Sequence, residues 1–414
     1  NYLLIECAVM TRDTLPRIRN GILILFFAMG FASSATATRL AEIKLRIGSG
    51  DAIFGYALAA GAIGGTLGNW IAHRLIHKFG SRRIARTSGS IMMLVIASNG
   101  VINQAWQLAL TSLGISFCYS VTNVAMNSQG VDLEVQLKKS LMPRFHAGWS
   151  TGSFTTAVLG AVVAAVLTPT VHLSAIGITA TLLVWLGTSM MSPTDHKDDS
   201  HVAQHEKIPA DVRKRIVFIS FAMSLGLIAE VSVFDWSSIY MHETLGLALG
   251  VNALGVTCFY AIQIVMRAFI GSVQDRYGIA KVVRRVGLFA GITYLGILLV
   301  TNLVNSAENA ANSTLLTILA GASFGAVAIG VAAMPAAFLT AAGRIPQLST
   351  ARGIAAVAMT NAFFILLFKT IVSTIAGSAG LPIALMCTAC GLLAASFLSG
   401  ILESDLPVAT TLPS

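Results

Sequence analysis

The sequence predicts an all-α membrane protein with twelve transmembrane helices in two halves of six. Three observations lead to this: the composition is apolar, long stretches carry no charge, and one polar segment divides the chain. Of the 414 residues, 55% are hydrophobic and only 11% are charged, and the mean hydropathy is +0.77. Soluble proteins usually carry about 25% charged residues. A surface with so few charges is therefore expected to face lipid.

The uncharged stretches set the number of spans. A helix needs about 20 apolar residues to cross about 30 Å of hydrocarbon. The stretches 87–131 and 147–194 contain no Asp, Glu, Lys or Arg, and each is long enough for two spans with a turn near Asn103 or Pro169. The same criterion along the chain predicts twelve spans, at 20–38, 53–73, 87–104, 107–131, 145–167, 171–191, 216–241, 250–271, 285–304, 314–341, 353–376 and 381–401.

The basic residues predict the orientation, because Lys and Arg crowd short cytoplasmic loops. With the N-terminus inside, most of the 27 Lys and Arg fall inside, Arg39, Lys44 and Arg46 fall outside, and Arg267 and Lys369 fall within predicted helices. The net charge of +9 then reflects topology and the anionic inner leaflet, so we expect a lipid bilayer and no nucleic acid as partner. Both termini are expected in the cytoplasm. The first span lacks a cleavage pattern, so we expect no cleaved signal peptide.

The polar segment between Ser192 and Arg215 divides the spans six and six. We expect a cytoplasmic segment over 1–19, six helices over 20–191, a cytoplasmic linker over 192–215, six helices over 216–401 and a tail over 402–414. Similar short loops follow the second helix of each half, "HRLIHKFGSRR" at 73–83 and "GSVQDRYGIAK" at 271–281.

The second of these loops resembles the signature loop of the major facilitator superfamily, G-x-x-x-D-R-x-G-x-x-K, at Gly271, Asp275, Arg276, Gly278 and Lys281. The resemblance implies the major facilitator fold, in which two six-helix bundles are joined by a central cytoplasmic loop. In such a loop the glycines allow a sharp turn, the acid faces a neighbouring helix N-terminus and the arginine bridges to another acid, which holds a cytoplasmic gate shut. A short inner loop rich only in Gly and Arg is the alternative, and it leaves the spaced aspartate unexplained.

The loop of the first half departs from this pattern. His77 stands where the acid belongs, Lys78 follows it, and Gly80 is in place. An imidazole does not favour a helix N-terminus as a carboxylate does. We therefore expect this side of the cytoplasmic gate to close weakly or in a pH-dependent way.

Three further stretches resemble fucose-permease-like and related uncharacterised bacterial facilitators. They are "ATRLAEIKLRIGSGDAIFGYAL" at 37–58, "RFHAGWSTGS" at 144–153, and E-x-x-x-x-D-W-S-x-x-Y from Glu230 to Tyr240. This resemblance implies transport of a small polar solute, such as a sugar, by alternating access. The binding site would lie near the bilayer midplane between the two bundles.

Candidate proton-coupling residues are the ionisable groups of helices five and seven. Glu230 is predicted about 21 Å into its span, a depth at which an acid usually faces a cavity or a partner and often relays protons. The alternative is a structural partner for a buried polar group. Asp235 lies nearer the outer surface, where it relays protons or only hydrogen-bonds. His146 titrates near neutral pH or has no role at the interface.

Candidate substrate-binding residues are polar or aromatic residues within spans. Tyr119, Asn123 and Asn127 recur every four residues beside Ser116 and Ser120, which suits a polyhydroxylated ligand or ordinary interhelical packing. The remaining candidates each have an alternative as well. Arg39 attracts an anionic or hydroxyl-rich solute or extends to the headgroups, Trp149 and Trp236 stack a sugar ring or line the interface, and Lys369 pairs with Glu230 or Asp235 or extends outward.

No enzyme motif is present, neither G-x-S-x-G, H-E-x-x-H nor a Walker loop, so we expect no catalysis, and an ion gradient instead of ATP. No cofactor or metal is expected, since the C-x-x-C of Cys387 and Cys390 lacks partners. The sequence thus predicts a proton-coupled (symporter) or facilitative transporter of a sugar or other polar metabolite, monomeric and multi-pass in the plasma (inner) membrane. A drug/proton antiporter is one alternative, weakened because helix five lacks G-P-x-x-G-G. A sensor of the same fold that does not transport is the other.

Overall fold

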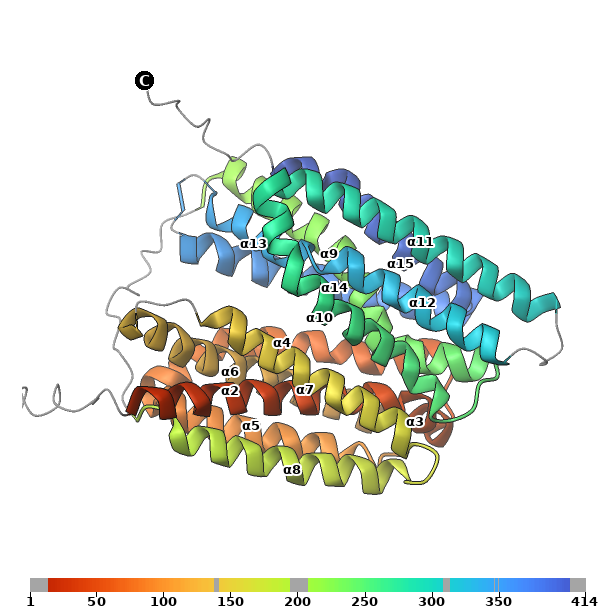
Figure 1. The fold of residues 1–414 in the computed structure, drawn as a ribbon, viewed down its shortest axis with the longest axis horizontal. Coiled ribbons are helices and arrows are strands. Elements are labelled where there is room, and N and C mark those ends of the chain that lie inside the picture. Colours follow the sequence, from red (N-terminus) through yellow and green to blue (C-terminus); the bar gives the residue numbers. More distant parts are fainter. Residues whose placement is uncertain are drawn as a thin grey trace, which may run out of the picture.

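The computed structural model describes residues 14–137, 141–193, 208–307, 313–345, 347–348 and 350–402, and their regular structure is helical throughout. The helices form two bundles, one above the other in Figure 1. The first bundle contains α2 (Thr14–Ser33), η1 (Ala37–Arg39), α3 (Leu40–Ile47), α4 (Asp51–Phe79), α5 (Ser81–Ser98), α6 (Ala105–Leu137), α7 (Met142–Val163) and α8 (Pro169–Met190). The second contains α9 (Ala210–Ile239), η3 (Tyr240–Thr244), η4 (Val251–Ala253), α10 (Leu254–Tyr277), α11 (Ile279–Ala307), α12 (Ser313–Val331), α13 (Met334–Gly343), α14 (Thr350–Ala379), α15 (Leu381–Leu398) and η5 (Ser399–Leu402).

These helices account for the twelve predicted spans. Nine segments within the described residues are long and apolar enough to cross a membrane. Helices α4, α5 and α7 complete the six of the first bundle, and they carry more polar residues, such as Arg82, Arg83 and Arg86 on α5. Large apolar side chains are exposed around the bundles, as a lipid-facing surface requires; examples are Leu94, Ile178 and Ile292.

Several helix boundaries differ from the predicted ones. Helices α4 and α6 continue beyond the predicted spans, to Phe79 and Leu137, because their polar ends keep helical geometry outside the apolar region. The predicted span 314–341 is two helices, α12 and α13, which break just before Met334 and Pro335. Proline lacks an N–H and clashes with the preceding turn, so it begins a helix more readily than it continues one. The linker lies mostly outside the described residues, as do 1–13 and 403–414 of the predicted terminal segments.

Close helix contacts in the first bundle depend on glycine. A Cβ added at Gly64 of α4 would lie 2.0 Å from the carbonyl oxygen of Leu113 on α6. A Cβ at Gly30 of α2 would lie 1.9 Å from the carbonyl oxygen of Trp149 on α7. Any larger residue would push these helices apart, so the glycines fix how far α6 and α7 stand from their neighbours.

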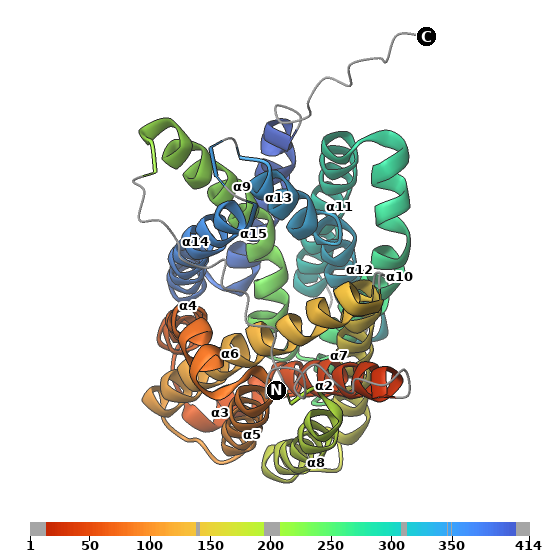
Figure 2. The same ribbon diagram turned by 90° about the vertical axis from the view of Figure 1, so that its left-hand side faces the viewer.

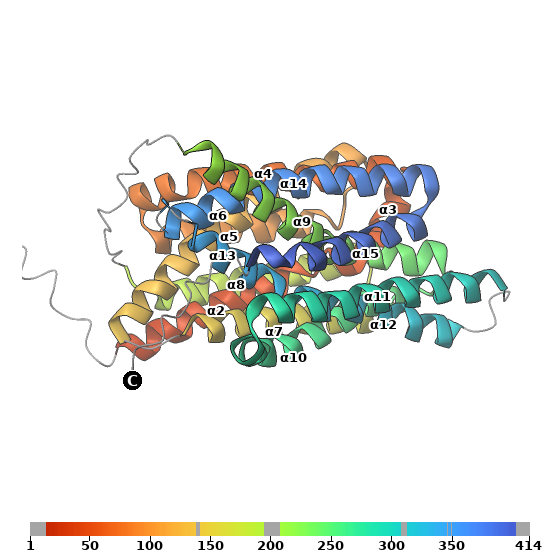
Figure 3. The same cartoon turned by 90° about the horizontal axis from the view of Figure 1, so that it is seen from above.

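The two bundles meet along two helix pairs, α4 with α14 and α7 with α10. The end view of Figure 2 shows both pairs between the lower and upper bundles, and Figure 3 shows α4 and α14 running alongside each other. We call the end that carries α3 the outer end and the end at which α2 and α9 begin the cytoplasmic end, following the orientation predicted from the basic residues. In Figure 1 the ribbons of the two bundles lie farther apart at the cytoplasmic end.

Candidate functional site

Glu230 lies near the middle of the second bundle's first long helix, α9, and is only partly exposed. The Nε2 atom of Gln263 on α10 donates a hydrogen bond of 2.9 Å to its Oε1 atom. Gln263 is completely buried, and its own Oε1 atom has no partner within the described residues. Among the described residues, the carboxylate of Glu230 therefore meets a neutral amide and forms no ion pair with a cation.

Arg267, one turn of α10 beyond Gln263, is a cation whose charge interacts with Glu230. Its Nη1 atom reaches across to the other bundle and lies 3.4 Å from the Oγ atom of Ser150 on α7. The arginine side chain is exposed, whereas Ser150 is buried. The charge of Arg267 acts electrostatically on Glu230, on Tyr119 of α6 and on His146 of α7. Both bundles therefore contribute to one polar site.

Aromatic rings enclose this site. Trp149 of α7 meets Tyr260 of α10 edge to face, with 6.2 Å between ring centroids. Tyr260 stacks in turn on Phe234 of α9 at 5.5 Å. Tyr119 lies next to Trp149. We call the following seven residues the central cluster: Tyr119, Trp149, Ser150, Glu230, Tyr260, Gln263 and Arg267.

The rest of the predicted polar face of α6 divides in two. Asn123 and Asn127 are partly exposed, and the Nδ2 atom of Asn127 donates to the Oδ1 atom of Asn123 at 3.0 Å. Ser116 and Ser120 instead pack against glycines of α4, Gly61 and Gly65. The amides thus follow Tyr119 along α6, and the serines serve helix packing.

His146 lies one turn before Ser150, near the start of α7. Its ring meets Phe26 edge to face, with 5.3 Å between centroids, and the residue is exposed. It is within the electrostatic reach of Arg267 but lies outside the central cluster.

Asp235, Trp236 and Lys369 lie together on the outer side of the central cluster. The Nζ atom of Lys369 forms an ion pair of 2.8 Å with Asp235 Oδ2 and donates a 3.0 Å hydrogen bond to the carbonyl oxygen of Leu58 on α4. Trp236 is 2% exposed and packs against Phe54 of α4. Of the partners expected for Lys369, it takes Asp235 and not Glu230.

Arg39 belongs to a separate buried group in the first bundle. Its Nε atom donates to Nδ1 of His172 at 2.9 Å, and its Nη1 atom forms an ion pair of 2.8 Å with Glu42. The arginine is completely buried. It is therefore not brought to the central cluster.

A second outer contact joins the two bundles, and no sequence pattern pointed to it. Lys44 of α3 forms ion pairs with Asp51 of its own bundle, at 2.5 Å, and with Glu243 of the other bundle. We call Lys44, Asp51 and Glu243 the outer tie. Lys44 is buried, whereas the side chains of Asp51 and Glu243 are partly exposed.

The two short cytoplasmic loops share one backbone feature. Gly80 and Gly278 both take positive φ, 84° and 87°, where each helix ends and the next begins. This is the sharp turn expected of the loop glycines. Gly271 is different, because it lies inside α10.

The charged residues of these loops are exposed. His77, Lys78, Asp275 and Arg276 all face outward, and Arg276 lies over the ring of Tyr277 at 5.3 Å. Asp275 forms no ion pair with another described residue. The cytoplasmic end thus lacks, at this acid, the charge pairing found at the outer tie.

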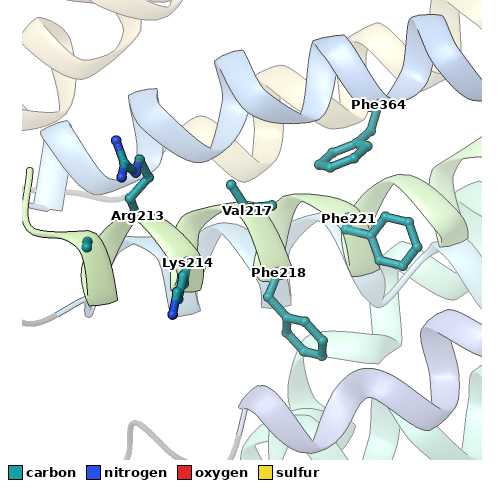
Figure 4. Close-up of a pocket in the computed structure, with 7 residues that line it drawn as sticks. Arg213, Lys214, Val217, Phe218, Phe221 and Phe364 are labelled. Atoms are coloured by element: carbon teal, nitrogen blue, oxygen red, sulfur yellow. The ribbon is translucent and has the colours of Figure 1, made fainter.

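A cavity of about 490 Å³ opens beside the first turns of α9, on the cytoplasmic side of the central cluster. Figure 4 shows the rings of Phe218, Phe221 and Phe364 along it, with the cations Arg213 and Lys214 nearer the start of α9. It shares no residue with the central cluster. Within the described ranges no three His, Cys, Asp or Glu lie close enough together to hold a metal ion.

Sequence reasoning missed three polar residues of the central cluster, Gln263, Arg267 and Ser150, and one ring, Tyr260. A signal was present on α10, since Tyr260, Gln263 and Arg267 follow one another at three and four residues and so share a helix face. Ser150 carries no comparable signal, because serine is common at packed helix contacts.

Comparison with known proteins extends over most of the chain. The sequence profile of the Major Facilitator Superfamily matches residues 21–368. An uncharacterised transporter of Sinorhizobium fredii, y4wD, is 28% identical over 330 residues, 78% of this chain and 81% of that protein. An uncharacterised MFS-type transporter of Yersinia pestis is 27% identical over 236 residues, 56% of this chain and 60% of that protein.

Solved structures show the same fold at low sequence identity. A mutant of the nucleoside transporter NupG superposes with a TM-score of 0.74 at 13% identity, covering 94% of this chain and 100% of that one. The D-xylose-proton symporter superposes with a TM-score of 0.69 at 9% identity, covering 95% and 97%.

Proposed function

Because the chain belongs to the major facilitator superfamily, we propose that it carries a small polar solute, a sugar or related metabolite, across the membrane by alternating access and couples this movement to protons at Glu230. The central cluster is then the substrate site. In this fold class, substrate and coupling-ion sites lie near the bilayer midplane at the interface of the two halves.

The observation that carries the proposal is the setting of Glu230. Its carboxylate lies deep in a membrane helix, accepts a bond from the buried Gln263, and forms no ion pair with another described residue. An acid held in this way changes charge with little loss of structure. Ionisable residues inside membrane helices commonly act as proton relays for this reason. Asp235 is a weaker candidate, since Lys369 holds it in an ion pair.

The contacts between bundles support a gating cycle. The outer tie and the bond from Lys369 to Leu58 join the bundles at the outer end. Asp275, in the signature loop, is exposed at the cytoplasmic end. We assign this arrangement to an inward-facing state. When the bundles rock, the outer tie opens, and Asp275 and Arg276 come to meet the first-half loop of His77, Lys78 and Gly80.

The wider setting is proposed on the same basis. The protein acts as a monomer in the plasma membrane, with both termini in the cytoplasm, because the basic residues favour that orientation. The substrate enters from one side of the membrane and leaves to the other while the two bundles stay intact.

The test is uptake into proteoliposomes with an imposed pH gradient, using labelled sugars and sugar derivatives. The unaltered protein should accumulate substrate when the outside is acidic. Glu230→Gln should lose gradient-driven accumulation by at least tenfold but keep exchange of substrate between the two sides. Asp211→Asn is the matched control, since this exposed acid lies at the start of the same helix.

Three outcomes would overturn parts of the proposal. Accumulation by Glu230→Gln at the unaltered rate would remove Glu230 from coupling. Gradient-driven extrusion of dyes without sugar uptake would point to a drug/proton antiporter. Ligand binding without any flux would point to a sensor of the same fold.

A further inference from the structure

Arg267 has far fewer partners than an arginine in a membrane helix normally takes. A guanidinium carries five N–H donors. In the part of the chain that the structure describes, Arg267 makes one hydrogen bond, of 3.4 Å, to Ser150. Intramembrane cations usually pair with acids or backbone carbonyls. Most of the donor capacity of Arg267 is therefore available at the boundary between the bundles.

Neighbouring charges leave Arg267 without a permanent counter-ion. Glu230 is close enough for its charge to interact with the guanidinium, yet it bonds to Gln263 and forms no ion pair with Arg267. Lys369, the other cation within a predicted span, is already held by Asp235 and by the carbonyl oxygen of Leu58. Within the described residues, Arg267 is thus the cation of the central cluster that an anionic ligand could meet.

We propose that the central cluster takes a polyhydroxylated monocarboxylate, a sugar acid, and that Arg267 binds its carboxylate. A guanidinium fork matches one carboxylate with two parallel hydrogen bonds. A phosphate ester fits less well, because its second charge would meet no second free cation of the central cluster among the described residues and would be repelled by Glu230. This inference rests on the proposed function, since it takes the central cluster as the substrate site.

The remaining groups of the cluster suit the rest of such a molecule. Tyr119 and Asn123 of α6 present a hydroxyl and an amide. These groups can donate hydrogen bonds to ligand hydroxyls and accept hydrogen bonds from them. Gln263 is completely buried, so it holds Glu230 in place and is not expected to contact the ligand itself. The rings of Trp149 and Tyr260 provide an aromatic wall for the apolar face of a sugar ring.

Proton and anion should then bind cooperatively. When Glu230 is protonated, the negative charge next to Arg267 disappears and the guanidinium attracts the carboxylate more strongly. Linkage requires the reverse as well, so a bound sugar acid should favour protonation of Glu230. Glu230→Gln imitates the protonated state. The affinity of Glu230→Gln for sugar acids should not depend on pH, as long as the pH is above the pKa of the ligand's carboxyl group.

The experiment measures binding to the purified full-length protein by thermal shift and calorimetry. The probes are two matched pairs, D-gluconate against D-glucose and D-galacturonate against D-galactose. We expect at least one sugar acid to bind and its neutral partner to bind at least tenfold more weakly. Arg267→Gln should weaken sugar-acid binding by at least tenfold, and Arg267→Lys by less, because it keeps the charge and loses the fork. Arg284→Gln, an equal charge change on an exposed part of α11, should have no effect.

The outcomes separate this inference from the proposed function. Neutral sugars that bind as well as the acids, binding by neither acid, or unchanged sugar-acid affinity in Arg267→Gln would each overturn it. Sugar acids that bind through Arg267 but show no flux in proteoliposomes would leave the anion contact standing and overturn transport. Proton-driven uptake of neutral sugars alone would leave transport standing and overturn the anion contact. If Arg267→Gln fails to fold, Arg267→Lys still tests the inference, because it should also weaken sugar-acid binding.

Discussion

Arg39 and Arg267 are both arginines within the apolar part of the protein, but their surroundings differ. Arg39 is completely buried and bonds to Glu42 and His172 inside one bundle. Arg267 is exposed and reaches a single serine in the opposite bundle. The charge of Arg39 is matched by the carboxylate of Glu42 in its own bundle, whereas Arg267 forms no ion pair with another described residue.

Structural and functional charges in a membrane protein are expected to differ in how they are partnered. A buried charge without a partner is costly, so a cation needed only for stability is expected with its partners already in place. A cation that must receive a ligand keeps donors free, and the fold tolerates this only where water or substrate has access. By this criterion we expect Arg39 to stabilise the first bundle and Arg267 to bind substrate.

The largest effect should come from breaking the Arg39 group. Arg39→Gln leaves the carboxylate of Glu42 buried without its cation, which costs roughly 3–5 kcal/mol when one partner of a buried ion pair is removed. The thermal unfolding midpoint in detergent should fall sharply. Arg267→Gln, by contrast, should cost less than about 1 kcal/mol, because it removes no buried pair.

The comparison fails if the two variants lose equal stability. Arg39→Lys is the useful control, since it keeps the positive charge near Glu42 but cannot keep both bonds. The thermal unfolding midpoint of Arg39→Lys should lie between those of the unaltered protein and Arg39→Gln.

A smaller loss of stability is expected at the pair of Lys369 and Asp235, whose surroundings are intermediate between those of Arg39 and Arg267. The pair is within one bundle, but Lys369 also bonds to Leu58 of the other. Lys369→Gln leaves Asp235 mostly buried and uncompensated, at a cost of about 2 kcal/mol. Adding Asp235→Asn should restore part of this loss, so the two changes should be non-additive in a double-mutant cycle of unfolding midpoints. Additive losses would show that the pair contributes nothing as a pair.

The fold followed from the sequence because hydropathy and charge act over whole helices. Uncharged runs such as 147–194 are expected to span the membrane, and every predicted span is helical, although the span 314–341 is divided into α12 and α13. Helix ends were less predictable. A helix such as α4 continues past the apolar region, and the break before Met334 depends on one proline in an otherwise uniform run.

The candidate site was less predictable, since a site depends on which helix faces meet. Glu230 and Tyr119 stand out by depth and by spacing, and the structure places both in the central cluster. Arg267 was visible as a charge within a span, but only the approach of α7 to α10 shows that it reaches Ser150. Lys44 and Glu243 are far apart in sequence and typical of surface positions, so nothing local marks them as partners.

The smallest effect on stability, but the clearest on conformation, is expected at Lys44. Like Arg39 it is buried and ion-paired, yet its partners Asp51 and Glu243 lie on different bundles. A partnered cation that joins two moving bodies should set their equilibrium instead of the stability of either. Lys44→Gln should weaken the closed outer end by about 1 kcal/mol, which raises the outward-open population about fivefold.

Paired spin labels measure this directly. The labels are placed in a cysteine-free background at two exposed outer positions, Ile53 on α4 and Ser378 on α14. In Lys44→Gln the distribution of distances between them should gain a longer component. Arg46→Gln is the control, because that arginine bonds to Gly100 in its own bundle and should leave the distances unchanged. The contrary outcome is that Lys44→Gln also leaves the distances unchanged while its melting midpoint falls as far as that of Arg39→Gln. In that case Lys44 does not control opening of the outer end, and the outer tie is structural like the Arg39 group.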